Sequence, residues 1–344
     1  MEAIDDFARH RSHPKVSLVV STFGSARYGD TIDLLLSVKR QNYNLIETFV
    51  IVERDKSTGE RLRAFASANG IPNANIIDYD GFPGLSATRT FGAKMASGDV
   101  VAFVDDDNVL FDDWASELAL SYDDPDVIGV SGPIYPEWLD SSMKWFPEEL
   151  YWMLGCSSWQ HRLDHTSEVR HAAGGNMSFR SSVFERCGYF VETVGNWNGG
   201  NGGWFVMSAE DIDFSLRARK LTGGKIVENP MVRCMGKVHP WRFSLVHISK
   251  RAFRFGLGRA RLMKVYGKDK ELFDMSLEKN HLLSVLRNSG RRGSVFGWRT
   301  AARRRLVLAI AISMFAAGYA AFFLLPGTPD ITRLPSSSAR KTST

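Results

Sequence analysis

The residues with the clearest capacity for chemistry form two acidic clusters. The first is Asp105, Asp106 and Asp107, directly after the apolar run Val100–Val104. Adjacent carboxylates repel one another, so three of them at the end of a buried segment need a neutralising partner. Mg²⁺ and Mn²⁺ prefer such oxygen ligands, and Mg²⁺ commonly takes one or two carboxylates together with substrate phosphates. The cluster therefore predicts a site for a divalent cation and a diphosphate.

Two other interpretations of this cluster remain open. It could be an acidic loop that caps the helix expected to begin near Asp112, which suits Asp112 and Asp113 better than the three preceding acids. The letters VDDDNV also fit a phosphatase motif in which the first Asp, Asp105, attacks phosphorus. That motif normally lies on the first strand of its domain, whereas here three predicted strand–helix units precede it.

The second acidic cluster is Glu210 and Asp211, at the start of a predicted helix. Helical spacing places Asp211 and Ser215 on one face, and Asp213 and Arg217 on another. A carboxylate in this position could act as the general base for an incoming hydroxyl group. Acids at a helix start also stabilise the helix N-terminus, so a capping role is the alternative.

Two glycine-rich segments accompany the acids. The segment HAAGGNMSFR, residues His171–Arg180, predicts a turn or a close approach of the backbone to a neighbour. The segment GNWNGGNGGWF, residues Gly195–Phe205, lacks the Lys-Ser/Thr that follows a phosphate-binding P-loop. A mobile loop and a lid over a substrate are both open interpretations of this second segment.

The elements that must position these residues alternate along the chain. Strands are expected at Lys15–Phe23, Glu47–Val52, 75–78, Val100–Val104 and Asp126–Gly132. Helical segments separate them at 30–41, 59–70 and 84–98. This alternation predicts an α/β fold with a mostly parallel sheet and helices on both faces. Ligands of such sheets bind beyond the carboxyl ends of the strands, where the triple Asp is expected.

Composition, charge and cysteine content indicate the kind of partner and the compartment to expect. The 344 residues carry a net charge of +5, with 44% hydrophobic and 24% charged residues, as in an ordinary globular chain. The stretch Lys250–Arg305 is basic and indicates an anionic partner; no nucleic-acid recognition motif accompanies it, so a membrane surface is favoured over nucleic acid. A solvated surface helix is the alternative. Cys156, Cys187 and Cys234 match no zinc spacing and predict buried thiols in a reducing compartment.

The C-terminal part predicts membrane attachment. Leu306–Leu325 has no charge over 20 residues, which suits one transmembrane helix, and Arg303–Arg305 precede it. The basic excess lies upstream, so the bulk of the protein is expected to face the cytoplasm, with this helix as its single-pass anchor in the cell membrane. A buried core helix is the alternative. The predicted organisation is a domain at 14–245, a basic amphipathic membrane-proximal segment at 246–305, the helix at 306–325, and a disordered tail at 326–344.

Taken together, the order and spacing of these motifs resemble the GT-A glycosyltransferases of family 2. The likeness covers about residues 14 to 245 and rests on five features. They are VVSTFGSARYGD at the first strand, Glu53 after the second, SATRTFGAKMASGDVVAFVDDDN, the GGN-x-S-F-R segment Gly174–Arg180, and Glu210-Asp211 followed by Arg217 and the late His239. The resemblance implies the GT-A nucleotide-diphospho-sugar transferase fold.

The resemblance also implies roles on the donor side. Thr22 and Glu53 would contact the nucleotide base and ribose, and Arg89 would lie near the nucleotide. Asp105 and Asp107 would hold the cation, Mn²⁺ or Mg²⁺, and the sugar nucleotide. Further donor and metal contacts are implied for Asp106, Asn176 and His239. Two departures weaken the match, since many relatives have two acids where Glu53-Arg54 stands and Asn where Thr90 stands.

On the acceptor side, the resemblance implies that Asp211 deprotonates the acceptor, with Glu210 beside it. The segment Pro136–Cys156 is similar to archaeal-type members that extend lipid-linked glycans on dolichyl phosphate, some of which transfer glucuronic acid to a dolichyl-phosphate-bound hexose. The sequence thus predicts an inverting, metal-dependent transfer from a UDP-sugar, with UDP-glucuronate the expected candidate, to a polyprenyl- or dolichyl-phosphate-linked glycan. A membrane-tethered sugar-nucleotide-binding protein without turnover is the alternative outside enzymes.

Overall fold

The computed structural model describes residues 13–71, 73–157, 164–192, 194, 207–291 and 298–324. These residues fall into two compact units. The first holds the described residues up to 194 together with Glu210–Pro240, and the second holds 207–209 together with the chain from Trp241 onward. The glycine-rich segment Gly195–Phe205 and the expected disordered tail at 326–344 lie outside the described residues, so the open questions about them stay open.

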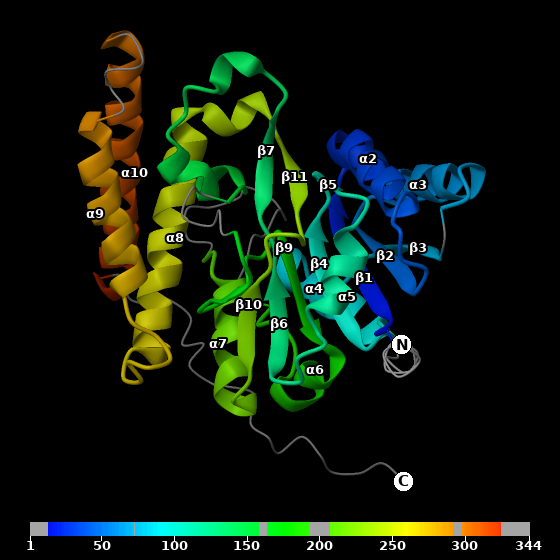
Figure 1. Ribbon diagram of the computed structural model, residues 1–344. Helices are drawn as coiled ribbons and strands as arrows, with labels where there is room; N and C mark the ends of the chain where they lie inside the picture. Colours follow the sequence, from blue (N-terminus) through cyan, green and yellow to red (C-terminus); the bar gives the residue numbers. More distant parts are fainter. Residues whose placement is uncertain are drawn as a thin grey trace, which may run out of the picture. The chain divides into compact units, whose positions relative to one another are not determined.

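The first unit is built on an eight-stranded sheet with the order β3-β2-β1-β4-β9-β6-β10-β8 (Figure 1). Its strands are β1 (Val16–Phe23), β2 (Ile46–Glu53), β3 (Ala74–Tyr79), β4 (Val100–Asp105), β6 (Val127–Ser131), β8 (Ser167–Glu168), β9 (Asn176–Arg180) and β10 (Lys225–Glu228). The block β3-β2-β1-β4 is parallel, as the alternation of strands and helices predicts. β9 runs antiparallel to both β4 and β6, so the sheet is mixed.

Helices cover both faces of this sheet, as predicted. They are α2 (Tyr28–Lys39), α3 (Lys56–Ala68), α4 (Leu85–Met95), α5 (Trp114–Leu120), α6 (Ser181–Cys187) and α7 (Glu210–Thr222). One core joins Val19 and Phe103 of the sheet to Ala93 of α4, Phe184 of α6 and Phe214 of α7. Side chains alternate between the faces of a strand, so the equally buried neighbours Leu18 and Val20 point to the opposite face, away from that core.

A second, three-stranded sheet lies within the first unit, in the order β5-β11-β7. Its strands are β5 (Asn108–Leu110), β7 (Ile134–Trp138) and β11 (Cys234–Val238). β5 begins directly after the triple Asp, and the amide of Lys237 on β11 donates to the carbonyl oxygen of Asp107 over 2.9 Å. This small sheet therefore brings a late part of the chain beside the acidic turn.

The second unit contains α8 (Leu245–Tyr266), α9 (Ser276–Arg291) and α10 (Trp298–Leu324). Helix α10 is the one helix among the described residues that is long and apolar enough to cross a membrane. Glycines bring α8 and α10 into backbone contact: a Cβ atom on Gly256 would collide with the carbonyl oxygen of Phe315, and one on Gly318 with that of Phe253. The expected apolar helix is therefore packed tightly against the basic helix α8.

The prediction that the three cysteines are buried thiols is confirmed. Cys156, Cys187 and Cys234 are all free and buried. Burial also raises the pKa of the Cys187 and Cys234 thiols, which keeps them protonated and unreactive.

Candidate functional site

The predicted site residues begin at the carboxyl ends of three neighbouring parallel strands. In β1 and β2, Phe23 pairs with Glu53 and Thr22 with Val52; in β1 and β4, Ser21 pairs with Asp105. The strands thus end in register, and Thr22, Glu53 and the triple Asp meet at one edge of the sheet. Strand β9 starts at the same edge, because Asn176 pairs with Val104.

Asp106 is the buried member of the acidic turn. Its side chain accepts a hydrogen bond from the hydroxyl of Thr22 over 2.8 Å, and both residues are less than a tenth exposed. Burial raises the pKa of Asp106 to about 7; the positive charge of Arg27 opposes this rise and the negative charge of Asp107 adds to it. Thr22 and Asp106 therefore form one polar contact under the turn and fix where the flanking carboxylates point.

Asp107 lies in a network of charges that joins distant segments. The Nη1 atom of Arg27 contacts Asp107 Oδ2 at 2.8 Å and Asp30 Oδ2 at 3.3 Å. Asp30 also accepts from Lys237 Nζ at 3.2 Å and contacts His239 Nε2 at 2.8 Å. Asp30 is 7% exposed, so three basic side chains gather on one buried carboxylate. Arg27 and Lys237 therefore balance much of the negative charge of Asp30 and Asp107 on this side of the site.

Arg89 connects the other end of the acidic turn to the second acidic cluster. It is 3% exposed and sits on α4. Its Nη2 atom donates to Asp105 Oδ1 at 3.1 Å and to the carbonyl oxygen of Gly174 at 2.6 Å, and its Nη1 atom reaches Glu210 Oε1 at 3.3 Å. One buried guanidinium thus holds β4, the glycine turn and α7 in a fixed arrangement.

The glycine turn lies directly between the two carboxylate clusters. A Cβ atom on Gly174 would lie 3.1 Å from Asp211 Oδ2, and one on Gly175 would lie 3.0 Å from Asp105 Oδ2. The amide of Gly174 donates to Asp211 Oδ2 at 2.9 Å, and the amide of Ile212 donates to Asp211 Oδ1 at 2.8 Å. The close backbone approach predicted for this segment is confirmed, and it orients Asp211 from both oxygens.

Glu210 and Asp211 differ in their surroundings. Glu210 is 6% exposed, whereas Asp211 is half-buried. Burial raises the pKa of Glu210 to about 7; the charge of Asp211 adds to the rise and that of Arg89 opposes it. Its Oε2 atom is buried without a hydrogen-bond partner among the described residues. Asp211 is therefore the more exposed carboxylate of this pair, and Glu210 is buried against Arg89.

The remaining predicted donor contacts lie in different places. Glu53 is buried, accepts from the amide of Gly84 at 3.2 Å, and has its pKa raised by burial. Asn176 is 1% exposed and uses its amide on the Trp114 indole at 3.0 Å and the Val232 carbonyl at 2.7 Å. Asn176 thus supports the fold at this edge, and its predicted contact with a sugar nucleotide stays a prediction.

The residue types at the acidic turn suit a divalent cation. No group of three His, Cys, Asp or Glu side chains able to hold a metal is found among the described residues. Asp105 and Asp107 are two hard carboxylates, each paired with a guanidinium, Arg89 and Arg27 respectively. Mg²⁺ and Mn²⁺ sites on nucleotides typically use one or two carboxylates, with phosphate and water completing the shell. The pair fits a cation that arrives together with a diphosphate.

Several residues that matter here were not singled out from the sequence. Arg27, Asp30 and Lys237 form the charge network around Asp107, but their partners lie up to 209 positions away. Only the basic and acidic letters within SARYGD and GKVH could have suggested them.

Two predicted helix-face pairs are confirmed on α7. Arg217 contacts Asp213 at 3.6 Å, while Asp211 and Ser215 both bind the turn at 172–174. Arg217 also donates to the carbonyls of Cys187 and Tyr189, which makes it a structural residue.

The capping alternative for the acids before α5 is not supported. Asp113 is the N-cap residue of α5 but makes no side-chain capping hydrogen bond. Asp112 instead pairs with Arg40 and Asp113 with Arg233.

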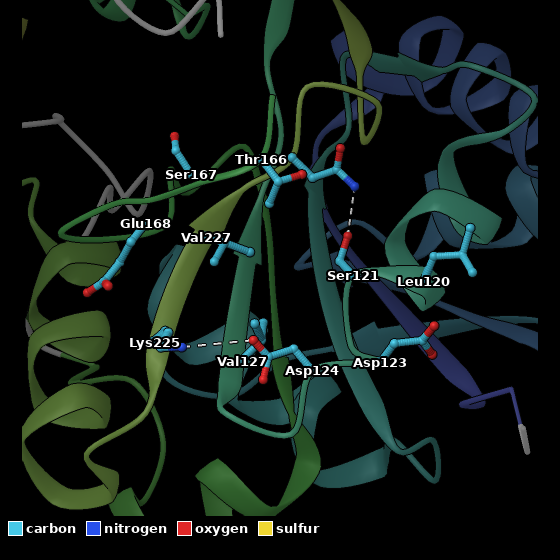
Figure 2. A pocket seen from close by; sticks show the side chains of 11 residues that line it. Leu120, Ser121, Asp123, Asp124, Val127, Thr166, Ser167, Glu168, Lys225 and Val227 are labelled. Carbon is cyan, nitrogen blue, oxygen red and sulfur yellow. Dashed lines mark hydrogen bonds and ion pairs between the residues drawn. The ribbon is translucent and has the colours of Figure 1, made fainter. Parts of the chain in front are cut away.

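A separate hollow of about 610 Å³ lies over β6, β8 and β10 (Figure 2). Lys225 at the start of β10 pairs there with Asp124 at 3.9 Å, and Glu168 of β8 borders it. None of the predicted site residues lines this hollow.

The comparison with known families decides the class of the protein. The family model of glycosyl transferase family 2 matches residues 17–188, which is half of the 344 residues and includes both the acidic turn and the glycine turn. The chain belongs to glycosyl transferase family 2. It is therefore a glycosyltransferase, and the phosphatase interpretation and the binding protein without turnover are set aside.

Individual relatives agree with this membership. The chain is 29% identical over 278 residues to the glucosyl-dolichyl phosphate glucuronosyltransferase of Haloferax volcanii, covering 80% of this chain and 86% of that protein. Among solved structures it resembles the mannosyltransferase PcManGT of Pyrobaculum calidifontis, determined in complex with GDP-Man and Mn²⁺, with a TM-score of 0.59 at 16% identity. That alignment covers 91% of this chain and 88% of the other, and it shows the GT-A fold.

Proposed function

We propose that this glycosyltransferase moves a sugar from a nucleotide-diphosphate donor to a lipid-linked acceptor on dolichyl or polyprenyl phosphate, with inversion at the anomeric carbon. The acceptor class is supported by the Haloferax volcanii relative, whose name specifies glucosyl-dolichyl phosphate as acceptor and glucuronate as the transferred sugar. We propose a UDP-sugar as donor, with UDP-glucuronate the first to test.

The donor end of the proposed site is the acidic turn. Asp105 and Asp107 would hold Mn²⁺ or Mg²⁺, and the bound cation would neutralise the charge that develops on the departing nucleoside diphosphate. This assignment is supported by the fit of the two carboxylates and by the Mn²⁺ in the mannosyltransferase structure. Asp106 and Asn176 would support donor binding from beneath the turn, and His239 would bind the metal or a phosphate.

The nucleoside would lie along the ends of β1 and β2. Thr22 and Glu53 are at those ends, and Arg89 stands beside Asp105. The Arg89 side chain is held in place because it also donates hydrogen bonds to the Gly174 carbonyl and to Glu210. In this proposal it orients Asp105 toward the donor and holds the glycine turn in place.

Asp211 would be the general base. Its two backbone hydrogen bonds fix the carboxylate, and each oxygen retains a lone pair that can accept the acceptor's proton. As that proton moves to Asp211, the acceptor oxygen bonds to the anomeric carbon while the bond to the diphosphate oxygen breaks. A single displacement of this kind inverts the anomeric configuration. The single observation that carries the proposal is the Gly174–Gly175 turn, which places Asp211 and Asp105 on either side of two residues without side chains.

Membrane attachment completes the proposal, because the acceptor is a lipid. The apolar helix α10 and the basic helix α8 support attachment of the enzyme to a membrane. We propose that the catalytic unit faces the cytoplasm, as the basic residues upstream of the apolar segment indicate.

The proposal is tested with membranes that contain the full chain. A panel of sugar nucleotides is supplied with glucosyl-dolichyl phosphate, and the lipid products are identified by mass spectrometry with release of nucleoside diphosphate measured in parallel. The expected result is one added sugar from a UDP-sugar and an inverted linkage by NMR. Transfer to soluble sugars but to no lipid-linked acceptor would refute the acceptor class.

A further inference from the structure

The contact between Arg27 and Asp107 involves a carboxylate that is also proposed to bind the cation. Arg27 Nη1 lies 2.8 Å from Asp107 Oδ2, a distance typical of a charge-assisted hydrogen bond. The Asp107 side chain is 6% exposed and that of Arg27 is 24% exposed. Asp107 is also one of the two carboxylates proposed to hold the cation, so the guanidinium and the cation compete for the same group.

A cation on Asp107 would lie a few ångströms from the Arg27 guanidinium, which contacts Oδ2 of the same carboxylate. Like charges at such a separation inside a protein repel, so binding of the cation favours release of the guanidinium from Asp107. Arg27 has a second anchor, because Asp30 contacts the same Nη1 atom at 3.3 Å. Asp30 is buried and itself held by Lys237 and His239, so it stays in place when the contact to Asp107 opens.

The diphosphate of the donor offers the released guanidinium a new anionic partner when the cation binds. A cation held by two carboxylates needs further oxygen ligands, and a diphosphate supplies them. Guanidinium groups bind phosphate oxygens through paired N–H donors, a geometry that suits a diphosphate beside the turn. Arg27 ends η1 (Ser25–Arg27) and contacts Asp30 three residues later, so it can exchange Asp107 for another anionic partner without losing this anchor.

We propose that Arg27 is an exchangeable counter-ion for Asp107: it neutralises Asp107 when no donor is bound and passes to the donor's diphosphate when the cation takes Asp107. This inference rests on the proposed cation site at Asp105 and Asp107. Its consequence is that the free cation binds weakly and that cation and nucleoside diphosphate bind cooperatively. The enzyme is thereby selective for the complex of metal and nucleotide over either partner alone.

Calorimetry on the detergent-solubilised full chain tests this. Titrations of Mn²⁺ alone, UDP alone, and Mn²⁺ with saturating UDP are compared for the wild type and Arg27→Gln. The variant is expected to bind Mn²⁺ alone about tenfold more tightly, which corresponds to ~1.4 kcal/mol. It should bind UDP in the presence of Mn²⁺ more weakly, so that the cooperativity between the two ligands falls by more than about tenfold.

Arg40→Gln is the matched control. Arg40 follows α2 and pairs with Asp112 at 3.2 Å, but both side chains are at least half exposed and neither belongs to the network around Asp107. This variant should leave all three titrations unchanged. Arg27→Lys provides a second measurement if the Gln variant is unstable. Lysine keeps the positive charge but lacks the paired N–H donors of the guanidinium, so the Mn²⁺ affinity of this variant should lie between those of the wild type and the Gln variant.

The outcomes separate the inference from the proposed function. If Mn²⁺ binds in the presence of UDP but its affinity alone is unchanged or weaker in Arg27→Gln and Arg27→Lys, Arg27 only braces the loop and the inference is wrong. If Mn²⁺ fails to bind the wild type even with UDP, the proposed cation site fails and the inference fails with it.

Discussion

Replacement of Asp211 by Asn removes the proposed base and leaves the size of the side chain almost unchanged. Asp211 accepts backbone hydrogen bonds through both oxygens, from Gly174 at 2.9 Å and from Ile212 at 2.8 Å. An Asn side chain has one acceptor oxygen, so one of the two amides must lose its partner. A hydrogen bond to a charged group contributes roughly 1.5–3 kcal/mol, so Asp211→Asn should destabilise the protein by about 2 kcal/mol. For a unit of this size that corresponds to a fall in Tm of about 4–8 °C.

Transfer should fall much further than stability. Loss of general-base catalysis typically costs about 10²–10⁴-fold in rate, whereas affinity for UDP with Mn²⁺ should stay within about twofold. The affinity is expected to hold because Arg89, not Asp211, contacts Asp105. The assay measures the single-turnover transfer rate by mass spectrometry of the lipid product, UDP affinity by calorimetry, and Tm by scanning calorimetry on the same preparation.

Asp213→Asn is the control for this experiment. Asp213 lies on the same first turn of α7, is 3% exposed, and loses its contact with Arg217 on substitution. It should lower Tm by a similar amount and leave the transfer rate near that of the wild type. Wild-type transfer by Asp211→Asn would refute the base assignment. Equal loss of transfer in both variants would show that the effect comes from the stability of α7.

Three further predictions concern metal, pH and the membrane. Asp107→Ala or treatment with EDTA should abolish transfer, and Mn²⁺ or Mg²⁺ should restore it only in the wild type; full activity after metal stripping would refute the cation site. Burial raises the pKa of Glu210 from its usual 4.5 to about 7, so the wild type loses stability as pH rises from the lower value to the higher. Chemical denaturation between pH 5 and 8 should therefore show Glu210→Gln gaining stability relative to the wild type as pH rises. A difference in unfolding free energy that does not change with pH would contradict this. Removal of the chain from Arg303 onward should weaken membrane attachment and leave a salt-sensitive remainder from α8, measured by vesicle flotation, whereas full release at low salt would show that α8 does not bind the surface.

The part of the fold that local sequence determines was predictable. Strand β1 was expected at Lys15–Phe23 and found at Val16–Phe23, and β4 extends the expected Val100–Val104 by one residue, Asp105. These strands are short apolar runs bounded by polar turns, so their sequence pattern is sufficient. The antiparallel direction of β9 was not predictable in this way. It depends on the Gly174–Gly175 turn reaching the end of β4, which is a tertiary contact.

The candidate site divides in the same manner. Asp105 and Asp211 could be chosen because each lies at a recognisable strand end or helix start, and Arg89 because its segment resembles the family pattern. That Arg89 joins the two acidic clusters is a result of the fold, since its contact with Glu210 spans 121 positions. Asn176 is a case that neither kind of reasoning decides: its motif predicts a donor contact, and the fold adds that its buried amide bonds to Trp114 and Val232.

The close packing of α8 and α10 at Gly256 and Gly318 would restrict how the second unit enters a lipid bilayer. With these two helices in backbone contact, α10 cannot move toward the bilayer centre without carrying α8 along. Helix α8 bears Arg251, Arg254, Arg259 and Lys264, and each charge brought to the hydrocarbon midplane costs about 2.5–3.5 kcal/mol. In the proposed membrane-bound state, the cations of α8 would therefore limit how deeply α10 can insert. The depth of the helix pair would then depend on the close packing of the two helices and on the charges of α8, and not on the hydrophobic length of α10 alone.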